Sequence, residues 1–159
     1  MVVKSALGHG STFSMYLPRV EAAVDRASNR STSNPLDGTE RILLVEDSIP
    51  VRKIAQTILE HYGYTVIVAA DTIDACRIFE GAPSEIDLVV TDVIMPRMDG
   101  RTLVDTLRRT RPELRVLFVS GYTDTAMVHP SERDDRTGFL AKPFTPEGLA
   151  RRVRRLFDS

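Results

Sequence analysis

The sequence alternates between short apolar runs and longer stretches in which apolar residues recur every three or four positions. The runs predict β-strands, and the periodic stretches predict helices that bury one face. Five runs lie within residues 41–47, 64–70, 87–92, 115–120 and 138–144. Strands that are apolar on both faces are typical of a parallel sheet covered by helices. The pattern therefore predicts an α/β fold with a doubly wound, five-stranded parallel sheet.

Four segments between and after these runs have helical periodicity. In the first, Pro50 suits a first helical turn and Gly63 suits a helix end, and the predicted inward face comprises Val51, Ile54, Ala55, Ile58, Leu59 and Tyr62. The other inward faces comprise Ala75, Cys76 and Phe79; Leu103, Val104 and Leu107; and Leu149, Val153, Leu156 and Phe157. A further helix would fall in residues 124–137, where Pro130 and a polar run predict an irregular fourth helix.

The chain before residue 40 differs from the rest in composition. Residues 20–39 hold Ser, Asn, Asp, Pro and Gly with little periodicity, which predicts a flexible linker. Residues 1–19 contain alternating apolar residues after a Gly8-His9-Gly10 turn, which predicts a β-hairpin or its second strand. The folded domain is therefore expected at residues 40–159.

Composition and charge argue against nucleic-acid and membrane binding. Lysine plus arginine number 21 against 22 acidic residues, and the formal net charge is -1. The single Cys76 excludes an internal disulfide framework, and no apolar run approaches the roughly 20 residues of a membrane span. We therefore expect a cytoplasmic chain that contacts neither nucleic acid nor membrane. The arginines of the last helix lie opposite its apolar face and are interpreted as a solvated surface; they are Arg151, Arg152, Arg154 and Arg155.

Polar residues gather where the predicted strands end, at the edge where open α/β sheets bind ligands. Glu46 and Asp47 close the first run, Asp92 closes residues 87–92, Ser120 closes residues 115–120, and Lys142 follows the last strand. Each one alone is an ordinary turn or capping residue. Three carboxylates at one edge repel one another, however, and a lysine and a divalent cation would compensate their charge.

Such a cluster suits phosphoryl chemistry. Asp92 can attack phosphorus as a carboxylate nucleophile and form an aspartyl phosphate. Mg²⁺ is often held by one or two carboxylates together with a phosphate. Charge on the transferring oxygens would be met by Mg²⁺, Lys142 and Ser120. We therefore predict a Mg²⁺-dependent phosphoacceptor site.

Four motifs carry a resemblance to a known family. The sequences "ILLVED", "VVTDVIMPRMDG", "VSGYTD" and "FLAKPF" occur in the order and at the separations of the receiver domain of two-component response regulators. The chain resembles this family over about residues 40–158. The resemblance implies a flavodoxin-like strand order 2-1-3-4-5, and partners that are histidine kinases or histidine phosphotransfer domains.

The resemblance also implies individual roles for the metal site. Asp92 takes the phosphoacceptor position, and Asp47 takes the position of a direct Mg²⁺ ligand. Glu46 takes the neighbouring acidic position, which can bind the metal through water. The backbone carbonyl of Ile94 would complete the site.

Ser120 and Lys142 match the hydroxyl and lysine that contact the phosphoryl group in this family. Phe139 matches its aromatic switch position but lacks the hydroxyl of the Tyr that many relatives carry. Any inward rotation of Phe139 is therefore expected to be driven by packing alone.

The first 19 residues resemble the last strands of a histidine-kinase ATPase domain, where a Gly-x-Gly-Ser/Thr-Thr-Phe stretch precedes a Leu-Pro. Followed by a linker and a receiver, this remnant suggests the C-terminal piece of a hybrid sensor histidine kinase. The remnant carries no nucleotide box, so this chain alone is not expected to bind or hydrolyse ATP.

Two other functions stay open at this point. A phosphate-independent interaction module could share the fold. A phosphohydrolase of the haloacid dehalogenase type also uses an aspartate at a strand end, but that family has a second Asp two residues later, where this chain has Ile94. Steady turnover of phosphoesters would favour the hydrolase, and absence of covalent phosphorylation would favour the module.

Overall fold

The computed structural model describes residues 2–6, 10–14, 34–121 and 135–159, which fall into two units, Met1–Thr32 and Ser33–Ser159. In the first unit, β1 (Val2–Ala6) pairs antiparallel with β2 (Gly10–Ser14). Gly10 adopts a φ of +80°, a conformation that glycine reaches without strain. The described residues of this unit thus form an antiparallel strand pair, which is what a hairpin requires.

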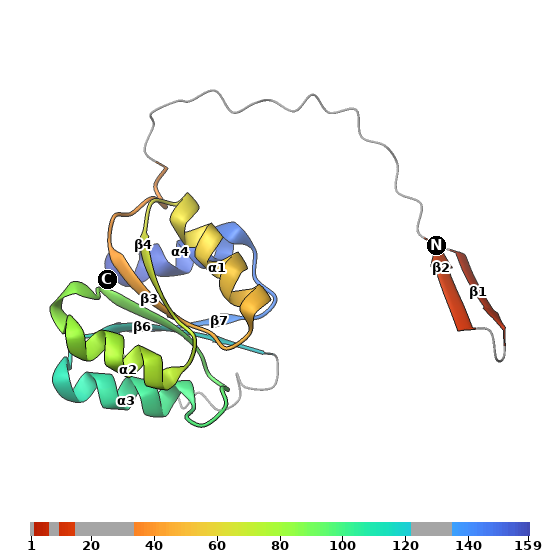
Figure 1. Ribbon diagram of the computed structural model, residues 1–159. Coiled ribbons are helices and arrows are strands. Elements are labelled where there is room, and N and C mark those ends of the chain that lie inside the picture. The colour runs from red at the N-terminus through yellow and green to blue at the C-terminus, as the bar shows by residue number, and fades with distance from the viewer. Residues whose placement is uncertain (1, 7–9, 15–33, 122–134) are drawn as a thin grey trace. The chain divides into compact units, whose positions relative to one another are not determined.

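The second unit is a five-stranded parallel sheet (Figure 1). Its strands are β3 (Arg41–Val45), β4 (Thr65–Ala69), β5 (Leu88–Asp92), β6 (Arg115–Ser120) and β7 (Thr137–Ala141). They lie in the order β4-β3-β5-β6-β7, which confirms the predicted order 2-1-3-4-5. The predicted irregular helix at residues 124–137 falls largely outside the described residues.

Helices cover both faces of the sheet (Figure 1). They are α1 (Ile49–His61), α2 (Thr72–Gly81), α3 (Gly100–Thr110) and α4 (Pro146–Phe157), with a short 3₁₀-helix at Pro83–Glu85. Helices α2 and α3 pack on one face with Leu43 and Val89, and α1 and α4 pack on the other with Ile42 and Leu44. Neighbouring strand residues point to opposite faces, so both faces need apolar residues and the strands are continuously hydrophobic.

The helix patterns were predicted with two errors. In α1, Ala55, Leu59 and Tyr62 are buried as predicted, but Ile54 is 57% exposed. Ile54 precedes Ala55, and one residue is a rotation of about 100° around a helix, which carries its side chain off the buried stripe. Gly63 ends this helix with a φ of +88°.

The second error concerns the arginines of α4. Leu149, Val153 and Leu156 are buried as predicted. The side chain of Arg154 is only 18% exposed and pairs with Glu40 at 2.9 Å, so the interpretation of a uniformly solvated arginine face is wrong at this position. Leu36 and Gly38, which lie in the stretch predicted as linker, also contact the domain, through the Tyr64 hydroxyl and the Tyr62 carbonyl.

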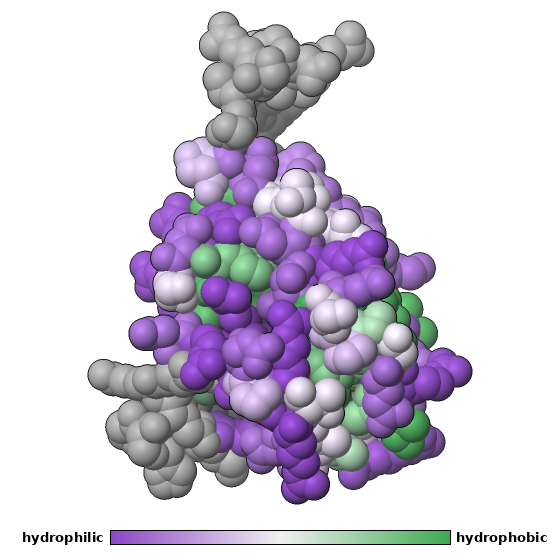
Figure 2. Space-filling model, turned by 90° about the vertical axis from the view of Figure 1, so that its left-hand side faces the viewer, coloured by the Kyte–Doolittle hydropathy of each residue, from purple (hydrophilic) through white to green (hydrophobic). Residues whose placement is uncertain are grey.

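The face shown in Figure 2 is largely hydrophilic, with smaller hydrophobic areas between polar side chains. Within the part of the chain that the structure describes, the exposed large apolar side chains are Ile49, Ile54, Ile73 and Ile94. Among the described residues, no helix is both long enough and apolar enough to cross a membrane.

Candidate functional site

Two central strands end on acidic residues at the same edge of the sheet. Strand β5 runs through four buried residues and ends at Asp92, whose side chain is 15% exposed. Strand β3, its neighbour, is followed directly by the buried Glu46 and the exposed Asp47. The strands are parallel, so their carboxyl ends present all three acids together.

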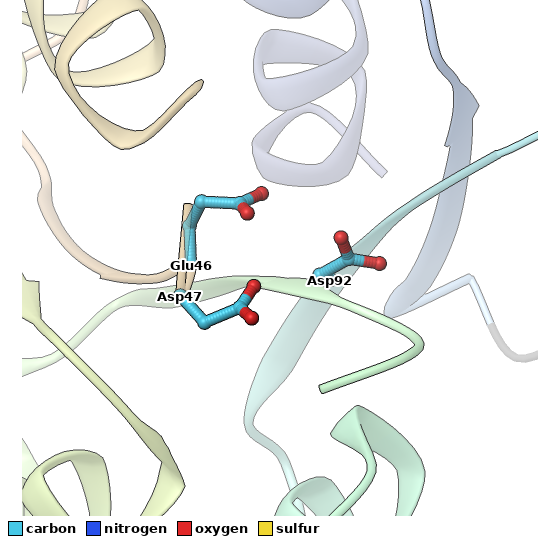
Figure 3. Close-up of side chains that lie close together, drawn as sticks. All are labelled: Glu46, Asp47 and Asp92. Atoms are coloured by element: carbon cyan, nitrogen blue, oxygen red, sulfur yellow. The ribbon is translucent and has the colours of Figure 1, made fainter. Parts of the chain in front are cut away.

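The three carboxylates converge as predicted. Glu46, Asp47 and Asp92 each offer one oxygen, and these oxygens lie within 4.8 Å of one another (Figure 3). Figure 3 shows the side chains of Glu46 and Asp47 extending from one strand end toward Asp92. Hard divalent cations such as Mg²⁺ take oxygen ligands of this kind, so the donor set fits the predicted metal.

Lys142 lies at the same place. It follows β7, and its ammonium donates to Asp92 Oδ2 at 2.6 Å and to Glu46 Oε2 at 2.7 Å. Burial would lower the pKa of Lys142, but hydrogen bonds and charge from Asp92 and Glu46 outweigh it and raise the pKa above 10.5. Lys142 is therefore a permanent cation at neutral pH.

One cation does not balance the site. Three acids and one lysine leave two negative charges uncompensated among these four residues. A divalent cation would supply the two positive charges that are missing. A phosphoryl group bound at Asp92 would then be a further anionic partner for Lys142.

The backbone around Asp92 fixes the direction of its carboxylate. The amide of Ile94 donates to Asp92 Oδ1 at 3.2 Å, which leaves Oδ2 for Lys142. The start of α3 also approaches closely, since a Cβ at Gly100 would overlap the carbonyl oxygen of Asp92. Gly100 donates to the Val93 carbonyl at 2.9 Å, so the loop after Asp92 closes onto the strand that carries it.

Ser120 and Phe139 lie on the neighbouring strands. Ser120 is buried at the end of β6, and its carbonyl accepts a hydrogen bond from the Lys142 backbone amide at 2.6 Å. The ring of Phe139 stacks on Phe118, with centroids 5.2 Å apart and an interplanar angle of 19°. The structure thus places Ser120 beside Lys142 and places Phe139 against the core.

Two contributors were missed from the sequence. Arg52 on α1 donates to the carbonyl of Glu46 at 2.6 Å and so holds the turn that carries two acids. Gly100 begins α3, and its lack of a side chain is what admits the Asp92 carbonyl. The helical periodicity of the sequence predicts neither contact. In each case the partner is a backbone oxygen of a residue outside the helix, that of Glu46 for Arg52 and that of Asp92 for Gly100.

Comparison with known proteins points to one family. Residues 42–154 match the family described as "Response regulator receiver domain". The sensor kinase CckA of Brucella abortus (strain 2308) is 38% identical over 97% of this chain, which spans 17% of that protein. The probable transcriptional regulator ycf27 of Cyanophora paradoxa is 33% identical over 74% of this chain, which spans 48% of that protein. The chain thus covers less than half the length of either relative.

Solved structures point to the same family. The crystal structure of the receiver domain from the hybrid histidine kinase CckA is 37% identical, with a TM-score of 0.62. That similarity covers 73% of this chain and 97% of the other.

Proposed function

The chain belongs to the response regulator receiver family of two-component signal transduction, and from this premise we propose that Asp92 accepts a phosphoryl group in a Mg²⁺-dependent reaction. The donor would be a phosphohistidine on a histidine kinase or a histidine phosphotransfer domain. One observation carries the proposal. Glu46, Asp47 and Asp92 gather within 4.8 Å, and Lys142 donates directly to Asp92.

In the proposed reaction, an Asp92 carboxylate oxygen forms the new bond to phosphorus while the bond from phosphorus to the histidine nitrogen breaks. The amide of Ile94 and the ammonium of Lys142 orient the Asp92 carboxylate before attack. Lys142 and the Ser120 hydroxyl would then pair with the phosphoryl oxygens. Asp47, Asp92 and the Ile94 carbonyl would hold Mg²⁺, with Glu46 acting through water, and the bound ion would neutralise charge on the phosphoryl group.

We also propose that the parent protein is a hybrid sensor histidine kinase. The match to the Brucella sensor kinase covers 97% of the chain, so it extends into the 39 residues before the receiver. The match to the Cyanophora paradoxa regulator covers only 74% of this chain. The antiparallel pairing of β1 with β2 supports the proposal that these strands are a remnant of an ATPase domain.

Intact-mass spectrometry after incubation with Mg²⁺ and a small phosphodonor tests the acceptor role. We expect one added phosphoryl group, lost in Asp92→Asn and retained in the control Asp105→Asn, whose side chain is exposed on α3. Equal labelling of Asp92→Asn would refute the assignment. Continuous release of phosphate from phosphoesters would instead favour the hydrolase, and no labelling of the wild type would favour the interaction module.

A further inference from the structure

Residues 34–40 pack onto the edge of the sheet opposite Asp92. Leu36 packs against the apolar cluster beneath α1 and α4, and its carbonyl accepts a hydrogen bond from the Tyr64 hydroxyl at 3.1 Å. The Gly38 amide donates to the Tyr62 carbonyl at 2.9 Å. We call residues 34–40, with the side chains of Tyr64, Arg154 and Phe157, the clasp.

Arg154 is the centre of the clasp. Its guanidinium pairs with Glu40 at 2.9 Å and with Asp158 at 3.1 Å. It also lies over the Phe157 ring, 5.1 Å from the centroid, and that ring stacks on Tyr64 with centroids 6.3 Å apart. A side chain that is 18% exposed and held by two acids and a ring has little freedom to leave.

Two glycines make the close approach of the clasp possible. A Cβ at Gly38 would overlap the Tyr64 ring and the Glu40 carboxylate. Gly63 has a φ of +88°, and a Cβ there would lie 2.7 Å from the Gly38 carbonyl oxygen. The segment therefore fits the domain surface only with glycine at both positions.

The clasp and the Asp92 site hold opposite ends of the same two elements. Glu40 directly precedes β3, and Glu46 directly follows it. Lys142 lies shortly before α4, and Arg154 lies in the last turn of α4. The ion pair Glu46–Lys142 therefore joins the end of β3 to the loop before α4, and the pair Glu40–Arg154 joins the start of β3 to the last turn of α4. Between the two pairs, helix α4 runs from Pro146 to Arg154, which is about 12 Å of helix.

We propose that the clasp couples the state of Asp92 to the chain segment upstream of the receiver. The proposal rests on phosphorylation of Asp92. A phosphoryl group there draws Lys142 from Glu46 and shifts the start of α4, and the helix carries this displacement to Arg154. The clasp loosens, and residues 34–40 are held less firmly. By linkage, a weaker clasp favours the phosphorylated arrangement by the same factor.

Amide hydrogen exchange, followed by NMR on the complete 159-residue chain with Mg²⁺, tests this coupling. The Gly38 amide and the Thr65 amide, which donates to the Glu40 carbonyl at 3.0 Å, report on the clasp. With the phosphate mimic beryllofluoride we expect both to exchange about fivefold faster. The Asp87 amide, which donates to the Arg41 carbonyl at 2.8 Å, is the internal control and should not change.

The effect of the clasp on the Asp92 site is tested with Glu40→Gln, which removes the charge that pairs with Arg154. We expect this variant to bind beryllofluoride about fivefold more tightly than the wild type, and Asp105→Asn to bind as the wild type does. Resonance shifts around Asp92 with unchanged exchange at Gly38 and Thr65 would overturn the coupling and leave the phosphoacceptor role intact. No shifts around Asp92 would overturn both. The wild-type exchange measurement decides the matter even if Glu40→Gln folds poorly.

Discussion

The Glu46 carboxylate and the Lys142 ammonium lie 2.7 Å apart, although 96 residues separate them in sequence. The Glu46 side chain is only 6% exposed, so it has little access to water as an alternative partner. Lys142 also holds Asp92 at 2.6 Å. Lys142 therefore neutralises the buried Glu46 and orients Asp92, the proposed nucleophile. A substitution of Lys142 tests both effects.

Lys142→Met is expected to lower the free energy of unfolding without divalent metal by about 1–3 kcal/mol, because Glu46 is left buried without its counter-charge. Urea unfolding in a chelating buffer measures this loss. Lys53→Met, at an exposed position on α1, is the control for loss of one lysine charge and should change stability little. An unchanged midpoint for Lys142→Met would show that the pair contributes nothing net.

Mg²⁺ is expected to stabilise the wild type through the acidic site. At a free concentration ten times its Kd, the gain should be about 1.4 kcal/mol. Asp47→Asn should abolish most of this gain, because Glu46 is already bonded to Lys142. Thermal unfolding over a Mg²⁺ series gives the comparison, with Asp105→Asn as the matched exposed variant. An equal gain in Asp47→Asn would exclude Asp47 as a ligand.

Gly100→Ala should destabilise the domain by about 1–3 kcal/mol and disturb the loop that carries Asp92, because the added Cβ overlaps the Asp92 carbonyl. Gly81→Ala is a close control. It also lies in a helix, and a Cβ there meets nothing within 4 Å, so it should be neutral or slightly stabilising. Equal effects of the two substitutions would mean that helix propensity, not the close approach, determines the result.

The parallel sheet and the acidic edge were accessible from sequence because both follow from local pattern, whereas the strand order 2-1-3-4-5 was implied by the resemblance to the receiver family. Continuous apolar runs such as residues 87–92 indicate buried parallel strands, and such strands place their carboxyl ends at one edge. The position of Asp92 therefore needed no tertiary information. The same reasoning brought Lys142 to the site.

The contacts of Arg52 and Arg154 were not accessible in the same way. Both side chains bind groups contributed by other elements, and their partners depend on helix rotation and on the path of residues 34–40. Ile54 illustrates the same limit, since an apolar residue beside a buried stripe looks identical in the sequence to one within it. Periodicity identifies a helix more reliably than it fixes its rotation.

Phe139→Ala should retain binding of beryllofluoride at Asp92, because Lys142 and Ser120 keep their backbone positions on β6 and after β7. Loss of the ring stacked on Phe118 should weaken the resonance response along β7 and α4. NMR titration separates the two effects. Phe139→Leu, which keeps an apolar side chain, should show a smaller loss, and an undiminished response in Phe139→Ala would exclude Phe139 as the switch.

The stability contributed by Glu40 should depend on pH. Burial alone would raise the pKa of Glu40, but hydrogen bonds from Arg154 and backbone amides, with the Arg154 charge, outweigh it and hold the pKa below its usual 4.5. A carboxylate whose folded pKa is lowered stabilises the fold above its unfolded pKa, and this stabilisation is lost as the pH falls through the folded value. Wild type should therefore unfold at a higher temperature than Glu40→Gln at pH 7, and the difference should shrink from about pH 4.5 downward. Parallel thermal unfolding curves from neutral pH to about pH 3 measure it, with Asp105→Asn expected to give no such pH-dependent gap. A gap between wild type and Glu40→Gln that stays constant across this range would show that the Glu40 charge does not hold the clasp.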